Sequence, residues 1–227
     1  MGNRSRRREG EPRSAARTVV GAVAVVVIAA AAVAIGATVG SKTPAGAPGV
    51  SDGGGITGEF QPVSVTGAAL EPRGETETDP AAGVEAPTLS GKDFRSRDVV
   101  IDPGSDGRPT MLVFLAHWCP HCNREVPQLL EWRDKGLVPE NLRVVGIPTA
   151  SRNDRPNWPP SDWLEEFGWP WEVLADSEAQ EAAIAYGVDG FPFVALVDAT
   201  GKVKTRWSGE RGVEGITDLV NEALGRL

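Results

Sequence analysis

The sequence predicts an α/β domain with a mixed β-sheet and helices on both faces, covering residues 83–227. Short apolar runs of strand length alternate there with helix-length segments, which is typical of α/β folds. One run, 110–116, is apolar almost throughout, as expected of a central strand covered on both faces. Near the end of the chain, two strand-like segments flank the turn at 198–201, which indicates a hairpin and so an antiparallel contribution to the sheet.

The expected elements follow in order along this domain. Strands are predicted at 99–101, 110–116, 142–147, 171–174, 193–197 and 203–207, and helices at about 120–135, 161–167, 178–186 and 213–224. Ser161 or Asp162 is the expected N-cap of the second helix, because their side-chain oxygens accept backbone N–H groups.

The N-terminal part of the chain has the charge pattern of a membrane anchor. Residues 1–18 form a basic tail with six arginines, and residues 19–39 carry no charge and are mostly Ala and Val. As a helix the second segment would be about 32 Å long, enough to cross a bilayer core. A cleaved signal peptide is the alternative, although its apolar core is usually about 7–15 residues long. We therefore predict a single-pass, uncleaved signal-anchor helix at 19–39.

The position of the arginines predicts the orientation of this anchor. By the positive-inside rule, the basic tail stays in the cytoplasm and everything after the span lies outside the cell membrane. Disulfides persist on that side. The whole chain has a formal net charge of −8, so nothing in it indicates nucleic-acid binding, which requires a basic patch.

Residues 40–82 are rich in Gly, Pro, Ser, Thr and acidic residues. A segment of this composition buries too little apolar surface to offset the entropy lost on ordering. We therefore predict that it is a flexible extracytoplasmic linker between the span and the domain at 83–227.

The only two cysteines of the chain, Cys119 and Cys122, form a Cys-x-x-Cys pair directly after the central strand. Pro120 suits the first position of a helix, where its missing N–H would have no partner anyway. A helix beginning here places the Cys119 sulfur at the positive end of the helix dipole, which favours the thiolate that attacks disulfides. The pattern predicts thiol–disulfide exchange, with Cys119 as nucleophile and Cys122 as resolving cysteine.

Two other interpretations of the pair stay open. His117 and His121 are near enough in sequence to complete a copper or zinc site with the cysteines, although no second Cys-x-x-Cys or His-x-His pair follows. A purely structural disulfide would close a loop too small to constrain the unfolded chain much. We expect no resident metal and no cofactor beyond the redox-active pair itself.

The residues around the pair resemble the thioredoxin superfamily. Trp118 precedes the Cys-Pro-His-Cys centre, and a Gly-Phe-Pro sequence ending at Pro192 precedes the last hairpin. Glu125 and Pro127 complete a Cys-x-x-Cys-x-x-Glu-x-Pro run, which is similar to the membrane-anchored, extracytoplasmic TlpA/ResA-like branch. The resemblance implies a thioredoxin fold for residues 83–227.

The spacing between the two motifs agrees with that branch. Residues 123–191, 69 in all, separate the second cysteine from Pro192. This length fits the β-α insertion of TlpA/ResA-like proteins, here at about 148–175. Four of the seven tryptophans lie within this insertion, at 158, 163, 169 and 171.

The resemblance implies further roles. Glu125 shares a helix face with Cys122 and is expected to exchange a proton with it, the alternative being a solvated carboxylate. Cytosolic thioredoxins place a buried aspartate six residues before the first cysteine, where this chain has Val113. His121 is expected to stabilise the Cys119 sulfur if its ring lies nearby, whereas His117 is expected at the surface.

The substrate-binding surface is also expected from the resemblance. A cis peptide bond before Pro192 would leave the backbone of Phe191 free to pair with a substrate strand. Trp118 would form one wall of the site, and Pro120 would belong to the same surface.

The direction of exchange is predicted from Pro120-His121, a dipeptide associated with DsbA-type oxidants, and favours a disulfide-forming oxidant. The alternative is a reductase for extracytoplasmic cysteines, for example before haem attachment to a c-type cytochrome. A third hypothesis is an interaction domain whose Trp-rich insertion docks a partner. The expected partners are cysteine-containing extracytoplasmic proteins and a membrane redox partner, since the span has no cysteine to relay electrons.

Overall fold

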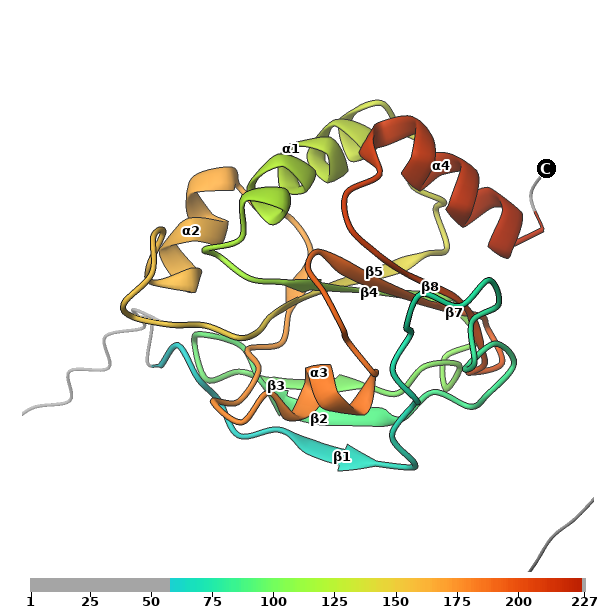
Figure 1. Ribbon diagram of the computed structural model, residues 1–227, viewed down its shortest axis with the longest axis horizontal. Coiled ribbons are helices and arrows are strands. Elements are labelled where there is room, and N and C mark those ends of the chain that lie inside the picture. Colours follow the sequence, from blue (N-terminus) through green and yellow to red (C-terminus); the bar gives the residue numbers. More distant parts are fainter. Residues whose placement is uncertain (1–57, 226–227) are drawn as a thin grey trace, which may run out of the picture. The chain divides into compact units, whose positions relative to one another are not determined.

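The computed structural model of the protein describes residues 58–225 (Figure 1). The predicted basic tail at 1–18 and the predicted span at 19–39 lie outside the described residues. None of the helices between residues 58 and 225 has the length and apolar character needed to span a bilayer.

A five-stranded mixed sheet forms the centre of the domain. Its strands are β4 (Thr110–Leu115), β5 (Arg143–Pro148), β6 (Glu172–Val173), β7 (Phe193–Val197) and β8 (Val203–Ser208). They lie in the order β6-β5-β4-β7-β8. Strand β5 pairs parallel with β4 and β6, whereas β7 runs antiparallel to both β4 and β8. The predicted mixed sheet with a closing hairpin is confirmed, and the topology is thioredoxin-like.

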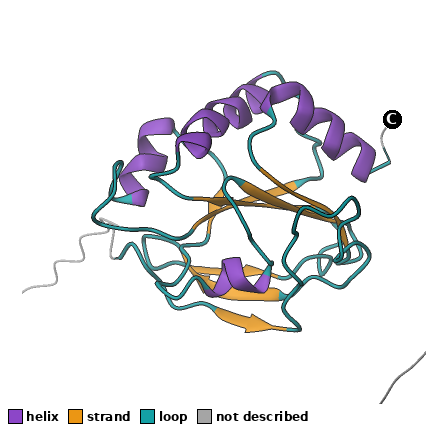
Figure 2. Cartoon of the chain, viewed as in Figure 1, coloured by secondary structure: helices purple, strands orange, loops and turns teal. Residues whose placement is uncertain are grey.

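Both faces of this sheet are covered (Figures 1 and 2). Helices α1 (Pro120–Asp134) and α4 (Gly212–Ala223) pack together on one face, with α2 (Pro160–Phe167) beside them. On the other side lie the short helix α3 (Glu181–Ala185) and an antiparallel sheet of β1 (Ser64–Thr66), β2 (Thr88–Lys92) and β3 (Asp98–Ile101). The sequence did not predict β1 or β2.

Strand β4 shows why the domain has two cores. All six of its residues are buried, and successive side chains of a strand point to opposite faces of the sheet. Leu112 and Phe114 join the core shared with β2, β3 and α3, whereas Met111, Val113 and Leu115 join the core under α1 and α4. The apolar run in the sequence therefore marks a strand between two layers, as predicted.

The linker predicted at 40–82 is too long, because residues 58–82 belong to the folded domain. Strand β1 pairs with β2, and the side chains of Val63, Leu70 and Ala81 are buried in the core below the central sheet. Composition alone suggested disorder because these apolar residues are few and widely spaced. The rest of the predicted linker, up to residue 57, lies outside the described residues.

Polar contacts hold this segment where apolar ones are few. The guanidinium of Arg206 is fully buried in β8 and donates hydrogen bonds to the carboxylate of Asp79 and to the backbone carbonyl of Glu71. Arg73 donates in turn to the carbonyl of Arg206. Arg206, from a distant strand, therefore binds the segment around 71–79 at both Glu71 and Asp79.

The structure also differs from the sequence prediction at the N-cap of α2. Pro159 occupies the N-cap position, and neither Ser161 nor Asp162 caps the helix. Instead, the carboxylate of Glu59 accepts hydrogen bonds from the backbone N–H and the hydroxyl of Ser161, at 3.0 and 2.7 Å. A residue that is distant in the sequence thus satisfies the free N–H groups of the first turn.

Candidate active site

The two cysteines lie where the central strand passes into α1. Strand β4 ends at Leu115, and Cys119 is the N-cap residue of α1 with an extended backbone. The N–H of Cys119 donates to the carbonyl of Ala116 at 2.9 Å, which closes the turn between strand and helix. Pro120 is the first, exposed residue of the helix, as predicted.

The two sulfurs have different surroundings. Both thiols are free; Cys119 keeps 7% of its surface exposed, and Cys122 keeps none. The Cys119 thiol donates to the carbonyl of Phe191 at 3.6 Å, and the Cys122 sulfur accepts the N–H of Ala116 at 3.4 Å. Burial raises the pKa of Cys122 strongly, and the charge of Glu125 adds to this. Cys119 is therefore the more exposed of the two cysteines, and Cys122 is a completely buried thiol.

Glu125 is buried, with 2% of its surface exposed, as its proposed role requires. Its carboxylate accepts the N–H groups of Arg211 at 3.0 Å and Gly212 at 3.3 Å, at the start of α4. Burial raises the pKa of Glu125, while these two N–H groups oppose the rise. The site thus contains a buried carboxyl group that is inclined to hold a proton one turn after Cys122.

An aromatic wall stands beside Cys119. The peptide bond between Phe191 and Pro192 is cis, as predicted, and Pro192 is buried. The rings of Trp118 and Phe191 meet edge to face with centroids 6.2 Å apart. The Trp118 indole N–H donates to the carbonyl of Ala150 at 2.8 Å. Trp118, Phe191 and Pro192 therefore come together around the sulfur, as the sequence indicated.

His121 lies among charged side chains on the exposed side of α1. Its Nδ1 is 2.8 Å from Nη2 of Arg124 and 3.3 Å from Oε1 of Glu210. Arg124 also forms a two-pronged ion pair with Glu210, with both N···O distances 2.9 Å. The sequence analysis did not single out Arg124 or Glu210. One sign of Arg124 was present in the sequence, a cation in the first two turns of the helix after the cysteines. No sign of Glu210 was present, because Glu210 is remote from the cysteines in the sequence.

The expectation that His117 is a surface residue is wrong. Its side chain is 1% exposed, and both ring nitrogens contact backbone groups of the segment that follows β5. Asn123, which the sequence analysis did not single out, also binds the residues around the dithiol. Its side-chain amide donates to the backbone carbonyls of His117 and Cys119. A histidine next to a Trp-Cys sequence carries no sign of burial on its own, since the segment that covers it is about 35 residues away.

The positions of the two histidines bear on the alternative of a metal site at the cysteines. Among residues 58–225, no three His, Cys, Asp or Glu side chains are grouped so that they could hold a metal ion. His117 is committed to backbone partners, and His121 faces Arg124 and Glu210.

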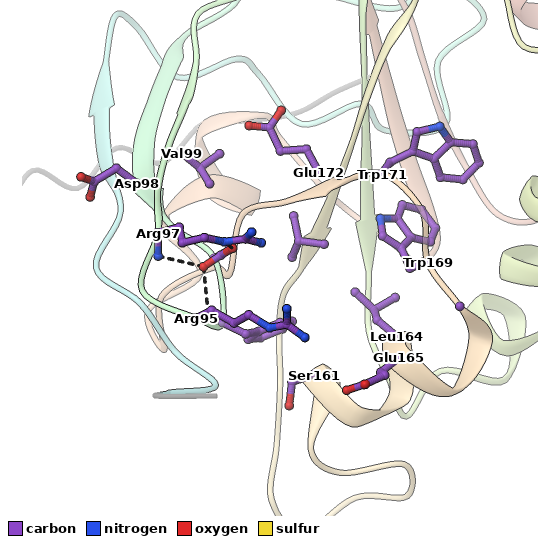
Figure 3. A pocket seen from close by; sticks show the side chains of 14 residues that line it. Arg95, Arg97, Asp98, Val99, Ser161, Leu164, Glu165, Trp169, Trp171 and Glu172 are labelled. Carbon is purple, nitrogen blue, oxygen red and sulfur yellow. Dashed lines mark hydrogen bonds and ion pairs between the residues drawn. The ribbon is translucent and has the colours of Figure 1, made fainter. Parts of the chain in front are cut away.

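A cleft of about 580 Å³ lies apart from the cysteines, between β3 and α2 (Figure 3). Residues of β3 and the turn before it, including Arg95 and Arg97, line one side, and α2 with Trp169 and Trp171 lines the other. The two indoles meet edge to face at 5.0 Å. Part of the Trp-rich insertion therefore shapes a surface that the dithiol does not share.

The fold and the site together define the class of this protein. A Cys-x-x-Cys pair begins α1 after the central strand of a thioredoxin-like sheet, with one sulfur near the surface and a cis-proline loop facing it. This is a thioredoxin-like oxidoreductase. More particularly, the chain belongs to the AhpC/TSA family, whose family model matches residues 78–206, more than half of the chain.

Two relatives of this chain are named as thiol:disulfide interchange proteins, an activity that uses a pair of cysteines. The thiol:disulfide interchange protein HelX of Rhodobacter capsulatus is 26% identical over 144 residues, which are 63% of this chain and 77% of HelX. The thiol:disulfide interchange protein DsbE of Haemophilus influenzae is 28% identical over 117 residues, 52% of this chain and 60% of DsbE. The match thus spans less than two thirds of DsbE.

Solved structures share the fold. A thioredoxin family thiol:disulfide interchange protein from Chlorobium tepidum superposes with a TM-score of 0.50 at 24% sequence identity. The superposition covers 64% of this chain and 99% of that protein.

Proposed function

We propose that this protein exchanges disulfides with cysteines of partner proteins outside the cell membrane, and that it acts as a disulfide-forming oxidant. The asymmetry of the two cysteines carries the proposal: Cys119, at the start of α1, keeps 7% of its surface exposed, whereas Cys122 keeps none. Only Cys119 can then form the mixed disulfide with a partner. The names of the relatives, thiol:disulfide interchange proteins, support the type of reaction.

The exchange takes place in two displacements. A partner thiolate attacks the Cys119 sulfur of the oxidised pair, forms a mixed disulfide and expels Cys122 as a thiolate. A second partner thiolate then attacks the partner's own sulfur in that mixed disulfide and expels Cys119. Two electrons have passed from the partner to the pair, and the partner has gained a disulfide.

Glu125 donates a proton to the buried sulfur of Cys122 and later accepts it back. A thiolate at Cys122 is unfavourable because burial raises the pKa of this cysteine. Glu125 has a raised pKa as well and lies one helical turn further along α1, so its carboxyl group protonates Cys122 as it leaves. The same carboxylate removes this proton when the pair is reoxidised.

Two features favour the oxidant. The sulfur of Cys119 stands at the N-terminus of a 15-residue helix, where the dipole stabilises a thiolate. The second feature is the Pro120-His121 dipeptide between the cysteines, which is associated with DsbA-type oxidants. A stabilised thiolate makes the reduced form more favourable, and this gives an oxidising potential.

One observation favours the alternative, a reductase of extracytoplasmic cysteines. The complete burial of Cys122 disfavours a thiolate in the pair, which lowers its oxidising power. In either direction, we propose that a membrane redox partner regenerates the pair and that residues 19–39 anchor the domain on the extracytoplasmic side.

A redox titration of the full chain in detergent micelles distinguishes these outcomes. Glutathione buffers set the potential, and the fluorescence of Trp118, adjacent to Cys119, reports the state of the pair. A midpoint between about −120 and −150 mV identifies an oxidant, and one below about −230 mV identifies a reductase. A chain without any two-electron transition would contradict the exchange function itself.

Trapping of the mixed disulfide tests the assignment of the two cysteines. Cys122→Ser leaves Cys119 without its resolving partner. Its thiolate should attack a peptide that carries a disulfide, expel one peptide sulfur as a thiolate and accumulate as a stable mixed disulfide. Cys119→Ser should form none, because the remaining thiol is buried. Adducts on Cys122 in the second variant would reverse the assignment.

A further inference from the structure

The bonds of His117 determine the protonation state of its ring. Nδ1 lies 2.7 Å from the carbonyl oxygen of Pro156, and Nε2 lies 3.1 Å from the backbone N of Arg152. The carbonyl can only accept and the backbone N–H can only donate. The ring therefore carries its proton on Nδ1 and is neutral, because a protonated Nε2 would face the N–H of Arg152 with a second donor.

The segment that His117 holds is the loop 150–157 between β5 and α2, which we call the insertion loop. Its beginning is bound through Ala150, whose carbonyl accepts the indole N–H of Trp118. Its end is bound through Asn157, whose amide donates to the His117 carbonyl at 2.9 Å. The ring of His117 supplies the two central bonds, so this loop is attached along its length to the residues just before Cys119.

The insertion loop carries a side chain to the partner-binding surface. The guanidinium carbon of Arg155 lies 5.9 Å from the centre of the Trp118 ring, a cation–π arrangement. Trp118 contacts Phe191, and the Phe191 carbonyl accepts the Cys119 thiol. The position of the loop thus determines what a partner meets next to the sulfur.

We propose that His117 is a positioning residue whose neutral ring holds the insertion loop against the dithiol and so maintains the Trp118–Arg155 part of the partner-binding surface. The inference rests on the proposed exchange function. It adds that protonation of His117 removes the bond to Arg152 and releases the loop, so that partner binding weakens in acid while the sulfur chemistry stays intact.

The groups around the ring agree with a neutral histidine at neutral pH. Burial lowers the pKa of His117, whereas the Pro156 carbonyl and the carboxylate of Glu59, from the segment before β1, oppose this shift. The charged side chain of Arg152 pairs with Asp154 within the insertion loop. The uncharged ring of Trp158 meets the imidazole edge to face at 5.8 Å.

Two readouts on the full chain test the inference. The first is hydrogen exchange of the Arg152 amide. The second is the kinetics of oxidation of a reduced two-cysteine peptide, with dithiothreitol as a small substrate that needs no binding surface. In the native chain, amide protection and a low KM for the peptide should persist down through pH 6.5, the ordinary pKa of histidine, and decline only in more acidic solution, because burial lowers the pKa of His117.

His117→Phe should abolish this behaviour, because it keeps a ring but removes both bonds. We expect rapid exchange of the Arg152 amide at pH 7.5, a KM for the peptide raised about tenfold, and kcat within about twofold of the native value. The pH dependence of KM relative to the native chain should disappear. The rate with dithiothreitol should not change.

Two further variants keep the test decisive. His117→Asn retains one amide donor for Pro156 and cannot titrate, so it should restore part of the protection without pH dependence, even if the Phe variant fails to fold. Arg155→Ala should raise KM but leave the protection of Arg152 and its pH dependence intact.

An unchanged KM and unchanged protection in both His117 variants would overturn the inference. In that case exchange with dithiothreitol would still proceed in the native chain. Loss of that exchange in the native chain would instead contradict the proposed function, so the two failures are distinguishable.

Discussion

The guanidinium of Arg206 lies fully buried against the carboxylate of Asp79, with Nη2 and Oδ1 2.6 Å apart across 127 residues of sequence. Burial alone would raise the pKa of Asp79, but hydrogen bonds from Arg206 and from the N–H of Ala81 outweigh it and lower the pKa. This pair attaches the segment before β2 to the edge strand β8.

Arg206→Leu should therefore destabilise the domain by roughly 3–5 kcal/mol, because it leaves the Asp79 carboxylate buried without its partner. Urea unfolding at pH 7 measures the loss. Arg108→Leu is the matched control, since Arg108 forms an exposed pair with Asp106 and should change stability much less.

The loss should also depend on pH. The folded-state pKa of Asp79 is lowered, so the pair contributes its full stability above about pH 4 and loses it as the pH falls through the folded pKa. The difference between native chain and Arg206→Leu should shrink in strong acid. A difference that is equal at pH 7 and pH 2 would show that the charge of Asp79 is not involved.

Glu125→Gln should slow the exchange without abolishing it. The variant cannot transfer a proton to or from Cys122, and general acid–base catalysis of this kind contributes about 10²-fold or more. Stopped-flow measurement of Trp118 fluorescence during oxidation of a dithiol peptide gives the rate. Glu131→Gln is the control, because Glu131 lies on the exposed side of the same helix. Equal rates in both variants would remove Glu125 from the mechanism.

The contribution of Glu125 to folding stability should change with pH in the opposite direction from that of Asp79. The pKa of Glu125 is raised in the folded state, so the native protein binds the proton more tightly than the unfolded chain does. Its contribution is present below about pH 4.5 and is lost as the pH rises through the folded pKa. Glu125→Gln should therefore gain stability relative to the native chain between pH 4 and pH 7.5, as urea unfolding at both values would measure. A constant difference would contradict the raised pKa.

Gly146→Ala should disturb the cleft between β3 and α2, because the new Cβ would lie 2.8 Å from the ring of Trp169, which lines that cleft. Such overpacking typically costs about 1–3 kcal/mol. Trp169→Ala alone removes the obstacle, so the double variant should lose less than the sum of the two single losses. Thermal unfolding of the four proteins measures this coupling, and simple additivity would show that the indole does not pack on Gly146.

The sequence predicted the site where its chemistry depends on neighbours along the chain. Cys119, Pro120 and Cys122 follow a buried strand and open a helix, and the burial of Glu125 and the cis bond before Pro192 agree with the family resemblance. The surroundings of the two histidines were not predictable. His117 is covered by a loop from another part of the sequence, and the ring of His121 meets Glu210 from the connection before α4.

By itself, the sequence determined the order of the main strands and helices, the two-sided burial of β4 and the placement of the dithiol. These depend on the periodicity of apolar residues and on local preferences at a helix start, which act over a few positions. Only the tertiary structure decided that residues 58–82 fold and that His117 is buried. Both involve polar contacts, such as those from Arg206 to Asp79 and from Arg152 to His117, that form only when distant segments meet. A buried polar group needs a specific partner, and a composition or a period does not reveal which one it finds.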